Sequence, residues 1–395
     1  MKVNKIFIFT SEPFPMGMAG TNRIISYAKG FLYHKKDVEV VCFRKTDVPG
    51  DVKNTNTTGV FEGVKFRYIT SSTVKSTNFV SRRLDDILSY IKLFFLALTK
   101  VNRYTMSIYY SSHTIPVIIL KIIHQIRGGV LLKEENEHPL IRIRLKNTIE
   151  KTLFQRLHYR LFDGFFLITE TLIEYFKISS SGKKPMLHVP MMIDFERFTG
   201  KKIVGPETKE IVYCGELSFV KDGIDILLKA FKKISEQHDE YILSFYGRAR
   251  PSELIGDINS LVNELNLDHK VFFHGQVDRD TITEKIMKAT ILVLPRPDSI
   301  QARHGFSTKL GEYLATGNPV LATSVGEIPN YLTDHENVFF AIPGDVRSLE
   351  EKLLFIIENY KLAMKIAHNG REFAENHFSN IKHTKRVLSF VESSF

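Results

Sequence analysis

The chain alternates short apolar runs with longer segments in which apolar residues recur at helical spacing. In the first half the runs lie at 5–11, 38–44, 64–70, 106–112, 130–136 and 165–170. In the second half they lie at 210–216, 241–247, 270–275, 290–296, 319–323 and 338–343. Near-continuous apolar runs separated by helical segments are typical of parallel strands that helices cover on both faces. The pattern therefore predicts an α/β protein with two series of parallel strands.

A segment rich in Gly, Pro, Lys and Thr, FTGKKIVGPETK (198–209), separates the two series and is typical of an interdomain linker. We expect residues 1–198 and 199–374 to form two Rossmann-like, doubly wound domains that face each other across a cleft. Residues 375–395 are helical in pattern and could return to pack on the first domain. Ligands of such sheets bind beyond the carboxyl ends of the strands, so the loops there are the places to seek chemistry.

Two helical segments carry apolar stripes beside basic residues. Leucine and isoleucine recur every four positions from Ile141 to Leu161, with Lys and Arg on the other faces. A second helix is expected over 84–98, with its core stripe formed by Leu84, Ile87, Leu88, Ile91, Phe94, Phe95 and Leu98, and with Tyr90 and Leu93 outside that stripe. Such surfaces suit docking on an anionic membrane leaflet, and ordinary buried stripes with solvated backs are the alternative.

The net charge of +10 admits three kinds of partner: nucleic acid, an anionic membrane surface and phosphorylated small molecules. The aromatic residues lie in the apolar runs and not between basic residues of one surface, so nucleic acid is not expected. The two cysteines, Cys42 and Cys214, each lie in an apolar run and are expected to be core residues of a reducing compartment. With no apolar run of about 18 residues, we expect a cytoplasmic protein, either soluble or peripheral on the inner face of the membrane.

The stretch FSTKLGEYLATGNP predicts a short helix with an anion site at its start. Ser307 is a suitable N-cap, and the following Gly and Pro end the helix near residue 316. The amides of the first turn, from Thr308 on, have no helical partner, and Lys309 adds a full charge beside them. Glu312 lies one turn beyond Thr308 on the same face, where its carboxylate could bind a ribose diol; the alternative is a solvated helix residue.

Two further loops offer groups for a phosphate. Lys221 precedes Asp222-Gly223 at a helix entry after the run 210–216, where a lysine can bridge phosphate oxygens as a point charge. Gly17 and Gly20 follow the first apolar run and allow close backbone approach, although their spacing is not that of the dinucleotide fingerprint. The ordinary alternative for Lys221 is a surface lysine near a turn.

Three segments, 187–198, 213–231 and 305–323, together resemble the family 4 glycosyltransferases, and the resemblance extends over essentially the whole chain. These are retaining enzymes of the GT-B fold, which has two Rossmann domains, and they use nucleotide-sugar donors without a metal. The resemblance implies transfer of a sugar from a nucleotide-diphosphate sugar to a hydroxyl of a glycan or lipid-linked acceptor, with no cofactor. The members that the chain resembles are of the type found in bacterial cell-surface polysaccharide synthesis.

The resemblance also implies roles for residues of the second domain. Glu312 matches the second acid of the family's glutamate pair, which is implied to hold the ribose hydroxyls, whereas the first acid falls on His304. His304 could still donate to a sugar hydroxyl. Lys221 matches the diphosphate-binding lysine and is assigned a catalytic role, but its companion arginine falls on Glu216. Two other cations could supply the missing charge, Lys309 and Arg296.

In the first domain the resemblance places Gly17 and Gly20 near the donor diphosphate and the acceptor. After the run 130–136, Asn136, Glu137 and His138 compete for the place of a family histidine. Glu137 is favoured as the catalytic group on the acceptor side, with Asn136 as a substrate-binding residue. Two alternatives stay open: a sugar-nucleotide epimerase of the same fold, and a non-catalytic nucleotide-sugar binding protein, which the departures at His304 and Glu216 suggest.

Overall fold

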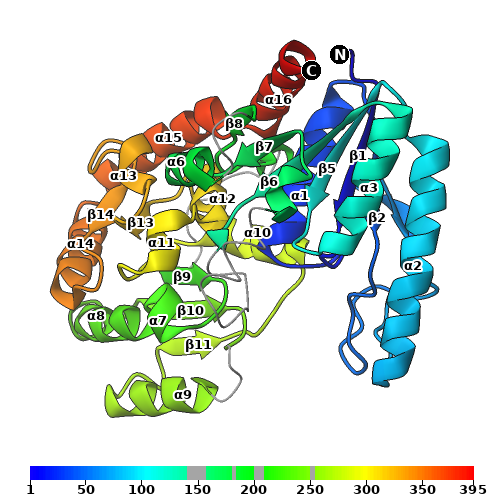
Figure 1. Ribbon diagram of the computed structural model, residues 1–395. Coiled ribbons are helices and arrows are strands. Elements are labelled where there is room, and N and C mark those ends of the chain that lie inside the picture. Colours follow the sequence, from blue (N-terminus) through cyan, green and yellow to red (C-terminus); the bar gives the residue numbers. More distant parts are fainter. Residues whose placement is uncertain (140–156, 180–183, 200–208, 250–253) are drawn as a thin grey trace. The chain divides into compact units, whose positions relative to one another are not determined.

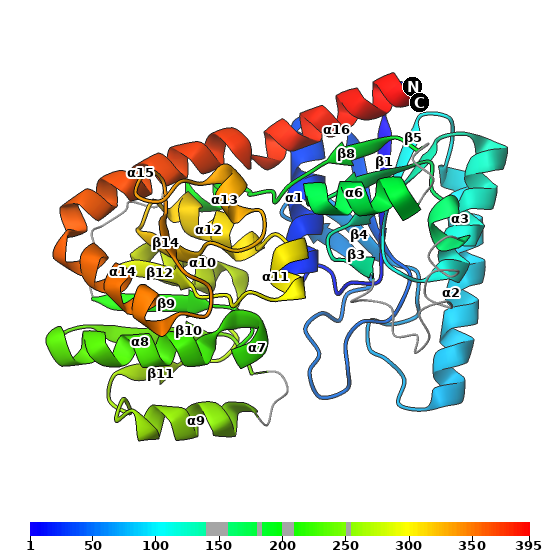
Figure 2. The same ribbon diagram turned by 60° about the vertical axis from the view of Figure 1, so that its left-hand side comes forward.

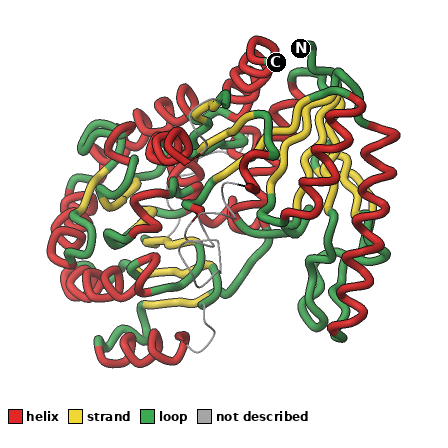
Figure 3. Tube along the Cα trace, viewed as in Figure 1, coloured by secondary structure: helices red, strands yellow, loops and turns green. Residues whose placement is uncertain are grey.

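The computed structural model describes residues 1–139, 157–179, 184–199, 209–249 and 254–395, which form two compact α/β units (Figures 1 and 3). Unit 1 comprises Met1–Asp194 with Asn380–Phe395, and unit 2 comprises Phe195–Ser379. Each unit contains one sheet of mainly parallel strands with helices against it, so the predicted fold class is confirmed. Residues 200–208 of the predicted linker and 140–156 of the predicted basic helix lie outside the described residues.

Unit 1 has an eight-stranded sheet of order β3-β4-β2-β1-β5-β6-β7-β8. All neighbouring strands are parallel except β3 and β4. Six strands coincide with predicted runs, whereas β3 and β8 were not predicted because β3 is an exposed hairpin arm and β8 has three residues. The strands are β1 (Lys5–Thr10), β2 (Asp37–Cys42), β3 (Thr58–Phe61), β4 (Val64–Tyr68), β5 (Thr105–Tyr110), β6 (Val130–Glu135), β7 (Gly164–Leu167) and β8 (Met186–His188).

Two pairs of helices cover this sheet. The named helices of unit 1 are α1 (Ala19–Tyr33), α2 (Phe79–Lys100), α3 (Thr114–Arg127), α6 (Glu170–Ser179) and α16 (Asn380–Ser394). α1 packs against α16, and α2 packs against α3; each pair lies side by side in Figures 1 and 2. Because parallel crossovers are right-handed, the strand order places α1 on one face of the sheet and α2 with α3 on the other.

Helix α2 contradicts the predicted core stripe. Leu84, Ile87, Leu88, Ile91, Phe94 and Phe95 are 38–59% exposed, whereas Ser89, Leu93 and Ala97 are buried. The expected orientation was therefore wrong. Helical spacing supports both stripes, because residues 87–98 are almost all apolar, and the sheet selects the narrower one. Small side chains at two of its three buried positions let the helix backbone approach its neighbours closely.

Unit 2 has a six-stranded, fully parallel sheet of order β11-β10-β9-β12-β13-β14, and all six strands coincide with predicted runs. The strand order reverses between β9 and β12, which marks the switch point where open α/β sheets bind ligands. The strands are β9 (Glu210–Cys214), β10 (Ile242–Tyr246), β11 (Val271–Phe273), β12 (Ile291–Leu294), β13 (Val320–Thr323) and β14 (Phe339–Ala341).

The helices of unit 2 pack in pairs, α8 with α14 and α12 with α15. A short 3₁₀ helix, η1 (Phe195–Phe198), opens the unit. The other helices are α7 (Phe219–Asp222), α8 (Ile224–Gln237), α9 (Leu254–Glu264), α10 (Arg279–Lys288), α11 (Ile300–His304), α12 (Thr308–Thr316), α13 (Ile328–Tyr331), α14 (Val346–Glu358) and α15 (Tyr360–His377). Of the helices described, none has the length and apolar character to cross a bilayer. Both cysteines are free, with Cys42 buried and Cys214 half-buried.

Candidate functional site

Lys309 lies at the switch point of unit 2 and is held by two partners. Its ammonium is 2.8 Å from the buried Oδ1 of Asp222, at the end of α7, and donates to the hydroxyl of Tyr213 in β9 at 2.6 Å. Gly215 makes room for this contact, since a Cβ there would overlap the ammonium, and its φ of 149° suits glycine. Burial lowers the pKa of Lys309, and the attraction of Asp222 opposes that effect. Sequence reasoning predicted the lysine but not its carboxylate.

Lys221 lies on the short helix α7 close to the same strand end. The side chain of Ser218 caps α7 by accepting a hydrogen bond from the Lys221 amide at 3.2 Å. The ammonium of Lys221 is 3.9 Å from Oε2 of Glu216, and the lysine side chain is 34% exposed. The acid that replaces the family's arginine therefore faces Lys221. Because the lysine side chain is a third exposed and the pair is 3.9 Å apart, the lysine can engage an anion instead.

Helix α12 begins and ends as predicted. It spans Thr308–Thr316 and is followed by Gly317 with φ 75°, the left-handed conformation that ends helices. Ser307 occupies the N-cap position, but its side chain accepts no capping hydrogen bond, which corrects the predicted capping role. Ser307 and Thr308 are half-buried. The first-turn amides thus receive no side-chain cap from Ser307, in keeping with the predicted anion site.

Glu312 is not a solvated helix residue. Its Oε1 accepts a hydrogen bond from Nη1 of Arg197 at 2.7 Å, and Nη2 of the same arginine donates to the hydroxyl of Thr283 at 2.7 Å. Arg197 comes from η1, which precedes the first strand of the unit. The arginine therefore fixes the carboxylate one turn into the helix. Sequence reasoning missed Arg197, although it lies in the segment 187–198 that carries part of the family resemblance.

The remaining predicted residues of unit 2, Arg296 and His304, lie in the segment that follows β12. Arg296 follows β12 and is buried, and its charge contributes to the lowered pKa of Lys309, so the two cations are close. Arg303, in α11, forms a bidentate pair with Asp298. His304 is the last residue of α11, and its side chain lies outside the described part of the chain.

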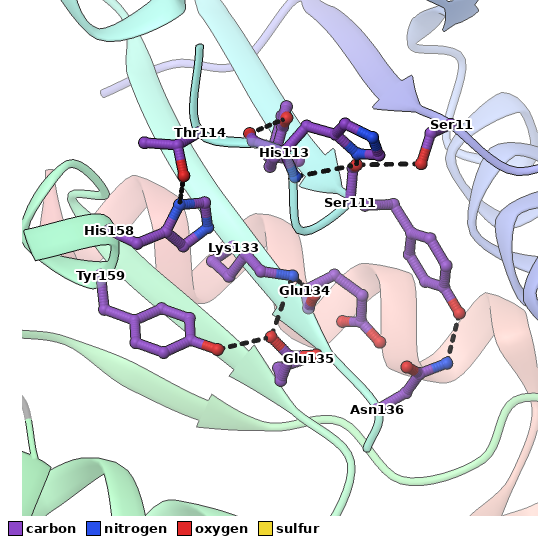
Figure 4. A network of polar contacts seen from close by, with 12 residues as sticks. Ser11, Ser111, His113, Thr114, Lys133, Glu134, Glu135, Asn136, His158 and Tyr159 are labelled. Carbon is purple, nitrogen blue, oxygen red and sulfur yellow. Dashed lines mark hydrogen bonds and ion pairs between the residues drawn. The ribbon is translucent and has the colours of Figure 1, made fainter. Parts of the chain in front are cut away.

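A second polar cluster lies at the carboxyl ends of three adjacent strands of unit 1 (Figure 4). Ser11 follows β1, Ser111 and His113 follow β5, and Asn136 follows β6. The hydroxyls of Ser11 and Ser111 are 2.9 Å apart, and Ser111 Oγ is 3.0 Å from His113 Nδ1. Sequence reasoning predicted Asn136 but missed both serines and His113, which it had placed only within a strand or just beyond it.

Asn136 carries an unused acceptor. Its amide nitrogen donates to the hydroxyl of Tyr110, and its buried Oδ1 accepts no hydrogen bond from any described residue. Buried amide oxygens normally have a partner, so this atom is suited to accept a hydrogen bond from a hydroxyl of a ligand. Of its competitors, Glu137 is half-buried, and His138 is buried with its ring 4.5 Å from that of Tyr175.

Below this cluster, β6 buries three consecutive charged residues. Lys133 pairs with Glu135 at 3.1 Å, and Tyr159 donates to Glu135 at 3.2 Å (Figure 4). Glu134 points to the opposite face of the strand and binds Arg23. Because each charge has an opposite partner, burial is tolerated, and the pairs fix the strand end from which Asn136 projects.

Side chains of unit 1 lie close to both predicted glycines, Gly17 and Gly20. A Cβ at Gly17 would overlap the hydroxyl of Thr21, which donates to the carbonyl of Pro13. A Cβ at Gly20 would lie 3.2 Å from the carboxylate of Glu12. Packing therefore accounts for glycine at position 17, and the acid beside Gly20 disfavours a phosphate at that point.

Two histidines of unit 1, the half-buried His113 and the buried His158, predict a loss of stability in acid. Burial and the charge of Arg44 lower the pKa of His113 to about 4, with Asp86 opposing; burial and Lys133 lower that of His158 to about 3, with Glu135 opposing. Both are neutral in the folded protein, whereas unfolded histidines take up protons below about pH 6.5. The free energy of unfolding is therefore expected to fall as the pH drops from about 6.5 towards 4, at up to about 1.4 kcal/mol per pH unit for each histidine.

Urea unfolding at several pH values measures this slope. His158→Gln is expected to flatten it, whereas the same change at the exposed His269 leaves it as in the wild type. An equal slope in both variants would contradict the assignment to His158.

Comparison with known proteins locates a family match in unit 2. Residues 194–373 match the family model of the glycosyl transferases group 1. An uncharacterized glycosyltransferase of Methanocaldococcus jannaschii is 26% identical over 180 residues, which are 46% of this chain and 43% of that protein. The N-acetyl-alpha-D-glucosaminyl L-malate synthase of Bacillus anthracis is 22% identical over 45% of this chain and 44% of its own. The chain thus spans less than half the length of these curated relatives.

Solved structures share the fold over almost the whole chain. A sucrose-phosphate synthase of Thermosynechococcus elongatus has a TM-score of 0.73 at 16% identity and covers 99% of this chain and 98% of its own. HepE of Anabaena, in complex with UDP and glucose, has a TM-score of 0.73 at 15% identity, covering 99% of this chain and all of its own. These neighbours are GT-B proteins. They support the predicted fold, and the family match supports the predicted resemblance at the level of glycosyl transferases group 1.

Proposed function

We propose that this protein is a retaining family 4 glycosyltransferase. It moves a sugar from a nucleotide-diphosphate sugar to a hydroxyl of a lipid-linked or surface-glycan acceptor, with no metal or cofactor, as in bacterial cell-surface polysaccharide synthesis. The observation that carries the proposal is the match of residues 194–373 to glycosyl transferases group 1. This stretch contains Lys221, Lys309 and Glu312, which form the candidate site of unit 2. HepE of Anabaena, a neighbour in fold, binds UDP-glucose, which supports a nucleotide-sugar donor.

The residues of unit 2 suit binding of the donor. An ammonium has three N–H donors, and in Lys309 two of them engage Asp222 and Tyr213, which leaves the third for a phosphate oxygen. Lys221 and the first-turn amides of α12 add positive potential at the same strand ends. Glu312, fixed by Arg197, has its second carboxylate oxygen to accept hydrogen bonds from a ribose diol.

The proposed reaction needs charge stabilisation more than a protein nucleophile. The bond between the sugar's anomeric carbon and the donor phosphate breaks, and a bond to the acceptor oxygen forms on the same face. The hydroxyl proton passes to the departing phosphate oxygen. Lys221 and Lys309 offset the negative charge that develops there. Asn136 and Glu137 of unit 1 are assigned to the acceptor, Asn136 through its unused Oδ1.

A screen of donors tests the proposal directly. The protein is incubated with UDP-, GDP- and ADP-sugars, and its unfolding temperature is measured. At 100 times the dissociation constant, a true donor is expected to stabilise the fold by about 2.7 kcal/mol. If no nucleotide sugar stabilises the protein, the proposal fails. With a stabilising donor, isomerised sugar formed without an acceptor would identify an epimerase, and binding without transfer to any acceptor would identify a binding protein.

Glu312→Gln is expected to weaken nucleotide binding by roughly 10- to 100-fold, since a hydrogen bond to a charged group contributes about 1.5–3 kcal/mol. Titration calorimetry with the stabilising nucleotide measures the effect. Comparing the ribose and 2′-deoxyribose forms of the nucleotide tests whether the lost affinity comes from the contact with the ribose. The loss of affinity caused by Glu312→Gln should be smaller for the form that lacks the 2′-hydroxyl. Glu284→Gln, on the exposed side of α10, is the matched control. Equal affinity in Glu312→Gln and wild type would remove Glu312 from the ribose site.

A further inference from the structure

Unit 1 presents an apolar surface formed by two neighbouring helices. On α2 it comprises the six exposed residues that were expected in the core, Leu84 to Phe95. On α3 it comprises Ile115, Ile118, Ile122 and Ile126, which are 41–66% exposed. We call this surface the α2–α3 face. None of its residues belongs to the donor site of Lys221, Lys309 and Glu312 in unit 2, and none has a role in the proposed reaction.

Helical spacing shows that each stripe points away from the sheet. On α2 the exposed stripe is opposite the buried Ser89, Leu93 and Ala97, and on α3 it is opposite the buried Val117 and Leu120. The two helices pack against each other and cover the same face of the sheet, as Figures 1 and 2 show. The two outward stripes therefore form one continuous surface.

The size of this surface is unusual for a protein that is free in solution. Half-exposed side chains of this size leave on the order of 100 Å² each outside, so ten of them leave on the order of 1,000 Å². Soluble monomers rarely expose a contiguous apolar patch of more than a few hundred Å². The α2–α3 face is therefore expected to be covered in the working protein.

The charges around the face identify what covers it. Residues 79–127 contain seven Lys and Arg and two Asp, so this stretch contributes half of the chain's net charge of +10. The two acids, Asp85 and Asp86, are already paired with Lys45 and Arg44. Arg83 and Lys92 flank the apolar stripe of α2 and are exposed, although Arg83 also lies 3.9 Å from Oδ2 of Asp86. A second copy of this chain would bring like charges together across a symmetric interface, whereas an anionic surface attracts them.

We propose that the α2–α3 face docks on an anionic lipid bilayer. The two helices lie in the plane of the interface, their apolar side chains enter the boundary between headgroups and acyl chains, and the flanking Arg83 and Lys92 contact lipid phosphates. The inference deepens the proposed function, because it names the surface that brings the protein to a lipid-linked acceptor. It rests on that proposed function for its purpose but not for its evidence.

Sedimentation with vesicles tests the docking. The full-length protein is mixed with vesicles of phosphatidylcholine alone or of phosphatidylcholine with phosphatidylglycerol. We expect binding to the anionic vesicles that weakens as salt is raised. The double variant Ile91→Glu/Phe95→Glu is expected to lower the bound fraction at least tenfold, and Arg83→Glu/Lys92→Glu to abolish the preference for anionic lipid. Ile178→Glu, which is 85% exposed on α6 of the same unit, is the control and should bind as the wild type does.

Three results would overturn the docking proposal. Wild-type protein that stays in the supernatant, or an Ile91→Glu/Phe95→Glu variant that binds as well as wild type, would remove the α2–α3 face. If the wild type forms a concentration-dependent dimer and the Ile91→Glu/Phe95→Glu variant is monomeric, the face is assigned to a second copy of the chain. Stabilisation by the nucleotide sugar is measured on the same proteins. If the nucleotide sugar still stabilises the Ile91→Glu/Phe95→Glu variant, that variant is folded. If the nucleotide sugar does not stabilise the wild type, the proposed function fails, but the docking proposal does not.

Discussion

Lys221→Ala is expected to lower turnover by roughly 100- to 1,000-fold, the usual cost of removing one group that stabilises charge in a transition state. The fold should survive the change. The side chain is a third exposed, and its ion pair with Glu216, at 3.9 Å, is of the exposed kind that contributes at most about 1 kcal/mol. Turnover is measured from release of the nucleoside diphosphate at a saturating concentration of donor. Unfolding in urea checks the stability of the variant.

Lys229→Ala is the matched control for this effect. Lys229 lies on the next helix, α8, is 48% exposed and pairs with Asp225 at 3.8 Å, so the change removes a comparable ion pair from a residue outside the candidate site. We expect near-normal turnover in this variant. A Lys221→Ala variant that turns over like Lys229→Ala would exclude Lys221 from the catalytic group.

The second large effect is expected in stability. Lys309→Met leaves the buried carboxylate of Asp222 without its counter-ion, and Oδ2 of Asp222 already has no hydrogen-bond partner among the described residues. Breaking a buried pair from one side costs about 3 kcal/mol or more, because an uncompensated charge stays buried. The free energy of unfolding in urea should fall by about that amount. Donor affinity should fall as well, if Lys309 binds the diphosphate.

A double variant separates the two roles of Lys309. Lys309→Met/Asp222→Asn removes both charges, so most of the lost stability should return while donor affinity stays low. A double variant with wild-type affinity would show that Lys309 serves only to neutralise Asp222. If the double variant is as unstable as Lys309→Met, the stability loss has another origin than the stranded charge.

The strands of both units could be predicted from the sequence because parallel strands covered on two faces must be apolar along their whole length. All six strands of unit 2 and six of the eight in unit 1 coincide with apolar runs. The orientation of α2 could not be predicted in the same way. Its sequence is apolar around most of its circumference, so spacing offers two stripes, and only the packing partner decides between them.

The candidate site shows a similar division. Local signals located Lys221, Lys309, Glu312 and the ends of α12, because helix starts, glycines and prolines act over a few residues. Their partners were not predictable from spacing. Arg197 reaches Glu312 across 115 positions of the chain, and Asp222 meets Lys309 across 87. Such pairs depend on which strand ends the sheet brings together, and a single sequence gives no direct signal of that.

The placement of α16 has a consequence for how the chain matures. This helix belongs to unit 1, and its Thr384 packs over Gly30 of α1, where any side chain would collide with it. During synthesis the ribosome therefore releases every residue of unit 2 before unit 1 receives its closing helix. Until that moment the side of α1 that packs on α16 is bare, so a nascent chain halted in unit 2 would be a substrate for chaperones that recognise uncovered helices.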